Sequence, residues 1–189
     1  MPEENGRPAC ESIKVVAFRG NRSRRFAAWF LSRLAEEKRG GRGPTRLDCL
    51  LYAGHTGVSI DGGITIYGFN PDSDLQIWRL MELLKLGQGF PGVVLDDTHI
   101  FGVANARGLQ SWSFEIIVPR PVFHAFGRKL DDERKASHYH YGFPNGDGDC
   151  NCTTWLERLG LPLLTGRMDE FAALLGLASY PKRRFGQCV

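Results

Sequence analysis

Residues 54–69 have the sequence GHTGVSIDGGITIYGF, two short segments with apolar residues around a glycine-containing turn. Its two halves, 55–60 and 64–69, flank an Asp-Gly-Gly turn at 61–63. Glycines supply the positive φ angles that a tight connection between antiparallel strands requires. The stretch therefore predicts a β-hairpin, with His55 at the start of its first strand.

Further strands and helices are predicted on both sides of this hairpin. The apolar spacing predicts strands at 14–18, 93–95 and 111–118, and helices at 24–39, from 71–73 to 87, from about 121 into the charged segment 131–135, at 152–159 and at 168–175. These elements follow one another without a regular β-α-β alternation. We therefore expect an α+β fold with an antiparallel sheet and packed helices, not a doubly wound parallel sheet.

The composition is that of one globular domain. Of the 189 residues, 42% are hydrophobic and 11% aromatic, which is enough apolar surface for one buried core. We expect a single domain over residues 1–189, with flexible tails at about 1–12 and 181–189. No stretch approaches the roughly 20 apolar residues of a membrane-spanning helix. The excess of Lys and Arg over Asp and Glu, 24 against 21, is too small to indicate nucleic-acid binding.

The cysteines and the first residues bear on the compartment. The five cysteines stand at positions 10, 49, 150, 152 and 188, and the start MPEENGRPACES is acidic where a signal peptide is basic and then apolar. An odd number of cysteines in a chain without a signal peptide indicates thiols and not a disulfide framework. We therefore expect the chain to be made in a cytoplasm.

A second segment, GDGDCNCTTW at residues 146–155, places a cysteine where thiol chemistry is favoured. Cys152 opens the predicted helix directly after a polar loop, and the free N–H groups and dipole of a helix start stabilise a thiolate. The same N–H groups could hold an oxyanion. His55, between Gly54 and Gly57, has an unobstructed imidazole that could take the thiol proton and return it to a leaving group.

The two segments together resemble the circularly permuted papain-like cysteine hydrolases. The resemblance lies in GHTGVS at 54–59, IYGF at 66–69 and NCTTW at 151–155. Related families are the permuted relatives of the NlpC peptidases, the lecithin:retinol acyltransferase group and the PPPDE desumoylating isopeptidases. In these families a histidine on a strand precedes a cysteine that opens a helix after an Asn-Cys pair. The resemblance implies Cys152 as nucleophile at a helix N-terminus and His55 as general base.

The resemblance also implies a third, orienting group on the strand after the histidine strand. Pairing across the turn at 61–63 brings Phe69 or Asn70 opposite His55, and Asn70 is the best-placed polar side chain. A register shifted by one residue would favour Tyr67 instead. A plain Cys–His dyad is the third alternative, since the PPPDE-like relatives manage with these two residues.

Metal binding competes for the same region of the sequence. His138, His140, Cys150 and Cys152 could supply four zinc ligands, but their spacing is poor for a zinc knuckle. Residues 145–149 imitate the start of a calcium loop whose later glycine and bidentate glutamate are missing. No glycine-rich phosphate loop occurs in the sequence. We therefore expect no metal and no cofactor.

The expected activity is that of a thiol-dependent hydrolase, a cysteine peptidase or amidase, working through a thioester on Cys152. The resemblance implies a peptide, isopeptide or peptidoglycan substrate. A bacterial effector or toxin fits this chemistry; it would be exported without a signal peptide by a specialised secretion system and controlled by an inhibitory immunity protein. The alternatives are an acyltransferase that uses the same site and a non-catalytic, zinc-stabilised interaction module.

Overall fold

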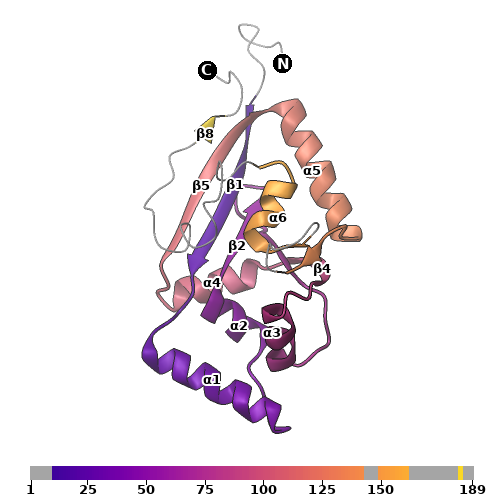
Figure 1. Ribbon diagram of the computed structural model, residues 1–189. Coiled ribbons are helices and arrows are strands. Elements are labelled where there is room, and N and C mark those ends of the chain that lie inside the picture. The colour runs from indigo at the N-terminus through magenta and orange to yellow at the C-terminus, as the bar shows by residue number, and fades with distance from the viewer. Residues whose placement is uncertain (1–9, 143–148, 162–182, 185–189) are drawn as a thin grey trace, which may run out of the picture.

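The central feature of the computed structural model is an open antiparallel sheet; the structure describes residues 10–142, 149–161 and 183–184 (Figure 1). Six strands in the order β6-β4-β3-β2-β1-β5 pair antiparallel, and two short strands, β7 and β8, extend the edges in parallel. The strands are β1 (Cys10–Arg19), β2 (Gly54–Ser59), β3 (Tyr67–Pro71), β4 (Phe90–Asp96), β5 (Ser111–Pro119), β6 (His140–Tyr141), β7 (Asp149–Cys150) and β8 (Arg183–Arg184).

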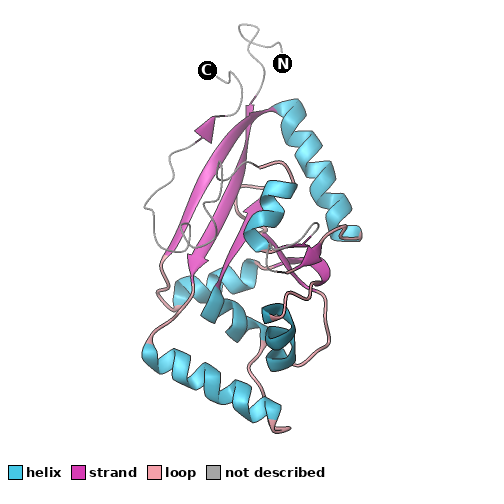
Figure 2. Cartoon of the chain, viewed as in Figure 1, coloured by secondary structure: helices cyan, strands magenta, loops and turns pink. Residues whose placement is uncertain are grey.

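Six helices of the described chain surround this sheet, so the predicted α+β class is confirmed. They are α1 (Arg24–Lys38), α2 (Arg46–Ala53), α3 (Ile77–Lys85), α4 (Thr98–Ala106), α5 (Arg120–Lys135) and α6 (Cys152–Arg158). Helices α1 to α4 gather at the end of the sheet where β1 finishes and β2 begins (Figure 2). None of the helices in the described ranges is long and apolar enough to cross a membrane.

The predicted hairpin is present as β2 and β3. Gly57 pairs with Gly68 and Val58 with Tyr67. The turn between the strands uses two left-handed residues, Gly62 at φ 75° and its neighbour at φ 102°. Continued by two residues, this register sets His55 opposite Asn70, one of the two partners that the sequence left open.

Two buried clusters hold the helices on the sheet. The first joins β1, α5 and α6, and in it the Trp155 ring of α6 stacks on Phe69 of β3 with centroids 5.5 Å apart. The second joins Phe18 of β1 to α2 and α4. Trp155 is fully buried, and truncation of such an aromatic typically costs about 3–5 kcal/mol. The short helix α6 is therefore fixed by its packing on β2 and β3.

The helices differ from the prediction in three places: two were not predicted, and one begins later. Helix α2 forms where no helix was predicted, because Thr45 and Asp48 make a complete capping box. Helix α4 was not predicted either. Helix α3 begins at Ile77 and not near 71–73, because buried Glu37 of α1 accepts the backbone N–H groups of Ile77 and Trp78 and so caps α3 from another helix.

The ends of the chain also depart from the sequence expectations. Residues 10–12 belong to β1 and 183–184 to β8, although both ranges were assigned to tails. Cys10 is disulfide-bonded, so the expectation of thiols throughout is wrong at this position, whereas Cys49, Cys150 and Cys152 form no disulfide. The predicted helix at 168–175 lies outside the described residues.

Candidate active site

His55 lies at the junction between α2 and β2. Gly54 ends the helix with φ 95°, a left-handed conformation that suits glycine, and turns the chain directly into the strand. The His55 side chain is buried and lies beside the rings of Phe18 and Phe101, with centroids 6.4 and 5.7 Å away. A rigid helix, a strand and two aromatic rings thus fix the imidazole.

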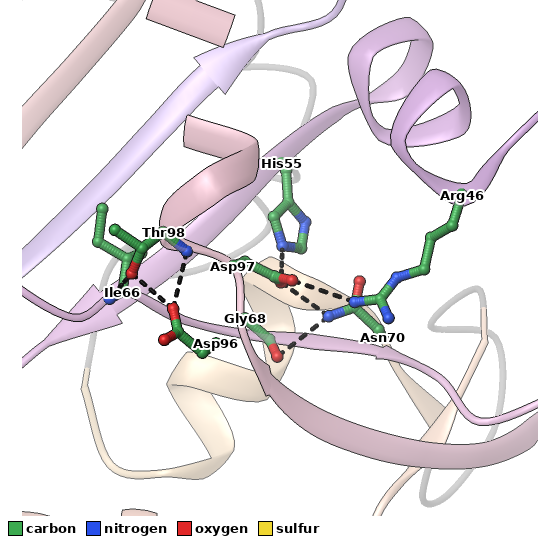
Figure 3. A network of polar contacts seen from close by, with 8 residues as sticks. All are labelled: Arg46, His55, Ile66, Gly68, Asn70, Asp96, Asp97 and Thr98. Atoms are coloured by element: carbon green, nitrogen blue, oxygen red, sulfur yellow. Dashed lines mark hydrogen bonds and ion pairs between the residues drawn. The ribbon is translucent and has the colours of Figure 1, made fainter. Parts of the chain in front are cut away.

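Asp97, directly after β4 and at the N-cap of α4, is the carboxylate that contacts this imidazole (Figure 3). His55 Nε2 lies 2.8 Å from Asp97 Oδ2, and both side chains are buried. The Asp97 backbone N–H donates to the Ile66 carbonyl at 2.8 Å, which ties the residue to the hairpin. Because a carboxylate accepts, Nε2 carries the hydrogen in the neutral ring, and Nδ1 has the lone pair that can take a proton.

Two further donors hold the same carboxylate. Asn70 Nδ2 donates to Asp97 Oδ2 at 2.8 Å and to the Gly68 carbonyl at 3.1 Å. From α2, Arg46 Nη2 donates to Asp97 Oδ1 at 3.1 Å. Donors from β2, β3 and α2 therefore meet on one side chain, and each fixes it from a different direction.

Gly68 makes room for the His55–Asp97 pair. A Cβ atom at position 68 would overlap the Asp97 carboxylate and His55 Nε2. A residue with any side chain would therefore displace the pair. This glycine is needed for space and not for an unusual backbone angle.

Cys152 is the first residue of α6 and is partly exposed. Asn151 caps the helix: its Oδ1 accepts the N–H groups of Thr153 and Thr154, each at 3.0 Å. These two N–H groups are engaged by the cap, which removes them from the oxyanion role that the sequence suggested for the helix start. Next to the cysteine, Thr153 Oγ1 lies 3.1 Å from Thr56 Oγ1, both buried. Since Thr56 follows His55 in the chain, this hydrogen bond ties the cysteine helix to the histidine strand.

The surroundings of the His55 imidazole raise its pKa. Burial alone would lower the pKa of His55, but the hydrogen bond to Asp97 and the interaction with the Cys152 thiol outweigh it and raise the pKa to about 9. Nδ1 of His55 is buried without a hydrogen bond of good geometry among the described residues. With Nε2 bonded to Asp97, Nδ1 is the ring nitrogen left for a further hydrogen bond or proton.

The structure brings the predicted residues His55, Asn70 and Cys152 close together, but Asn70 bonds to Asp97 and not to the imidazole. Asn70 is buried and reaches the imidazole through Asp97. Tyr67, the alternative, lies under the Arg134 guanidinium, 4.4 Å from its ring centre. Sequence reasoning missed Asp97, although a pair of aspartates directly after the predicted strand 93–95 was a visible signal.

The four candidate zinc ligands do not come together. Cys150 is fully buried in the core cluster with Trp155, His138 Nδ1 is bonded to Glu133 at 2.8 Å, and His140 is exposed. Within the part of the chain that the structure describes, no group of three or more His, Cys, Asp and Glu side chains is arranged to hold a metal ion. Most of the candidate calcium loop at 145–149 lies outside the described residues.

Comparison of this chain with the models of known protein families, with curated proteins and with solved structures found no match.

Proposed function

We propose that the chain is a thiol-dependent hydrolase in which Cys152 is the nucleophile, His55 the general base and Asp97 the group that orients it. The observation that carries the proposal is a buried imidazole held between a buried carboxylate and a partly exposed cysteine at a helix start. Nucleophile, base and orienting acid are the three parts that acyl transfer through a thioester needs.

The chemistry follows from the protonation pattern. His55 takes the Cys152 proton on Nδ1, and the imidazolium that results is stabilised by Asp97. The sulfur attacks the carbonyl carbon of an amide or ester, and His55 returns the proton to the leaving amine or alcohol as its bond to that carbon breaks. Water, deprotonated by the same imidazole, then hydrolyses the thioester and releases the acid and the free thiol.

The substrate class in this proposal comes from the resemblance to permuted papain-like hydrolases: a peptide, an isopeptide or a peptidoglycan stem peptide. A role as an exported bacterial effector with an immunity protein belongs to the same proposal. An acyltransferase would share every step up to the thioester and differ only in the acceptor, so both activities require the same Cys152 intermediate.

The test is to trap that intermediate. Incubation with p-nitrophenyl acetate should place an acetyl group on Cys152, found by peptide mass mapping, and release nitrophenol repeatedly. Cys152→Ala should abolish the turnover, and EDTA should leave it unchanged because no metal takes part. A panel of peptide amides, lysine isopeptides and muropeptides then identifies the leaving group.

Three results would overturn the proposal. One is acetylation spread over Cys49 and Cys152 alike. Another is acetylation of Cys152 that is unaffected by His55→Gln. The third is stoichiometric zinc whose removal unfolds the protein, which would favour the interaction module.

A further inference from the structure

Both oxygens of the Asp97 carboxylate accept hydrogen bonds, and each oxygen has different donors. Oδ2 faces the reacting side and accepts from His55 and Asn70, each at 2.8 Å. Oδ1 faces away and accepts from Arg46 Nη2 at 3.1 Å (Figure 3). A carboxylate anchored at only one oxygen can rotate about its Cβ–Cγ bond. A second anchor on the other oxygen stops that rotation.

Arg46 is itself placed by the helix that delivers the histidine. It is the first residue of α2, where the Thr45–Asp48 capping box fixes the opening turn. The same helix ends at Gly54 and leads directly into His55, and buried Leu51 anchors it to the second core cluster. Helix α2 therefore positions both His55, on one side of the Asp97 carboxylate, and Arg46, on the other side.

The Arg46–Asp97 pair is not an ordinary surface ion pair. The Asp97 side chain is 2% exposed and the Arg46 side chain 39%, so the carboxylate is desolvated while the guanidinium reaches it from the surface. A buried carboxylate needs its lone pairs satisfied, and removal of a donor leaves it free to find another partner. Without Arg46, Oδ1 would lose its donor, and the other two donors to this carboxylate, His55 and Asn70, are bonded to Oδ2.

We infer that Arg46 is a positioning residue of the proposed hydrolase: it holds Asp97 so that Oδ2 stays on His55 Nε2, and it acts on the Cys152 thiol only through that pair. The inference rests on the proposed function, because it assigns Arg46 a role in the proton exchange between His55 and Cys152. The charged and titratable groups that act on the ring are Asp97, directly after β4, and Cys152 from α6, with Arg46 of α2 behind Asp97.

The sign of one measurement separates positioning from a simple charge effect. Loss of a cation near His55 would raise the pKa of the ring through the electric field alone. Loss of the Asp97 orientation would weaken the hydrogen bond that raises this pKa, and would therefore lower it. The ring titrations of ¹⁵N-histidine-labelled protein, with the His55 signal assigned by its absence in His55→Gln, give that sign without any substrate.

We expect Arg46→Gln to move the His55 midpoint down by about one pH unit, and to slow alkylation of Cys152 by iodoacetamide at pH 6 about tenfold. Arg46→Lys should recover part of both effects, since it restores one donor and the charge. Guanidinium at low millimolar concentration should accelerate Cys152 alkylation in Arg46→Ala, where the partly exposed side chain leaves an open site. Arg33→Gln, which breaks the Arg33–Glu36 pair on α1, is the control and should leave titration and alkylation unchanged.

Contrary results are equally clear. An upward shift of the His55 midpoint in Arg46→Gln, or an unchanged midpoint with an unchanged alkylation rate, overturns the positioning role. If instead His55→Gln leaves Cys152 alkylation at its original rate, the proposed hydrolase fails, and the role of Arg46 fails with it. Normal dependence on His55 together with no response at Arg46 defeats the further inference alone.

Discussion

Two free thiols of similar exposure lie in opposite electrostatic surroundings. Cys49 lies inside α2, and burial, then Asp48 and Glu37, raise its pKa to about 12. Cys152 lies at the start of α6, whose first turn carries no acidic residue, and faces His55. Both side chains are of intermediate exposure, so accessibility does not distinguish them.

The difference shows what the fold supplies to a thiol. In α2 the residue before the cysteine is the acid that completes the capping box, so the helix start is stabilised at the expense of a nearby thiolate. In α6 the capping box consists of Asn151 and Thr154, both neutral, so no acidic side chain opposes the helix dipole at Cys152. Burial, and after it the acids Asp48 and Glu37, thus makes the Cys49 thiol inert, whereas the first turn of α6 holds no acid beside Cys152.

The largest expected effect is the contrast between the two alkylation rates. At pH 7 a thiol with a pKa of about 12 is ionised to only about one part in 10⁵, and alkylation needs the thiolate. We expect brief iodoacetamide treatment of the native protein to label Cys152 at least about 10³ times faster than Cys49. Mass mapping gives both rates from one sample, and in urea they should converge. Equal native rates would break the comparison.

The next effect comes from the imidazole. His55→Gln should slow Cys152 labelling and ester turnover at least about 10²-fold, the lower range for acid–base catalysis, and leave the Cys49 rate unchanged. His124→Gln on the exposed part of α5 is the control. Because His55 is buried on Asp97, its loss should also cost roughly 1–3 kcal/mol of stability, so the Cys152 rate and not the melting temperature is the diagnostic quantity. Wild-type reactivity of Cys152 in a destabilised variant would make His55 purely structural.

The features that could be predicted from the sequence are those that depend on residues close together in the chain. The hairpin and the position of Cys152 at a helix start follow from turn glycines and a cap, which act over a few residues, whereas the turn left Phe69 and Asn70 as alternative partners of His55. Asp97 lies between β4 and α4, and its contact with His55 depends on the β3–β4 pairing, which local sequence patterns do not encode.

Arg46 and α3 illustrate the same limit. The contact of Arg46 with Asp97 spans 51 positions, and Glu37 caps α3 from 40 and 41 positions away. The helix start predicted at residues 71–73 is not formed, because Pro71 pairs with Gly92 in the sheet. Helix α3 is instead capped by the tertiary contact with Glu37. The candidate nucleophile and base were therefore predictable from the sequence, and the groups that orient them were not.

A smaller effect on Cys152 labelling is expected from a side chain added at Gly68, next to His55 and Asp97. Gly68→Ala introduces a methyl group that overlaps His55 Nε2 and the Asp97 carboxylate, so the pair must separate. We expect Cys152 labelling to fall about tenfold, with a loss of about 1–3 kcal/mol in the free energy of unfolding from overpacking. Gly102→Ala is the matched control, because a Cβ there meets nothing within 4 Å and a helical alanine should be neutral or stabilising. If the two variants behave alike, the room at Gly68 does not matter to the site.

The smallest effect is the dependence of stability on pH. The pKa of His55 is about 9 in the folded chain against 6.5 for an ordinary histidine, so the folded state holds the proton more tightly. Its contribution to stability is therefore complete below about pH 6.5 and is lost as the pH rises through about 9. The melting temperature should fall by a few degrees more between pH 6.5 and 10 in the wild type than in His55→Gln. Asp97→Asn should flatten the difference as well, because it removes the hydrogen bond that raises this pKa, whereas Cys49→Ser should retain it. Identical slopes in wild type and His55→Gln would mean that the ring is neutral in the folded protein, and the ion-pair account of Cys152 would then have to be given up.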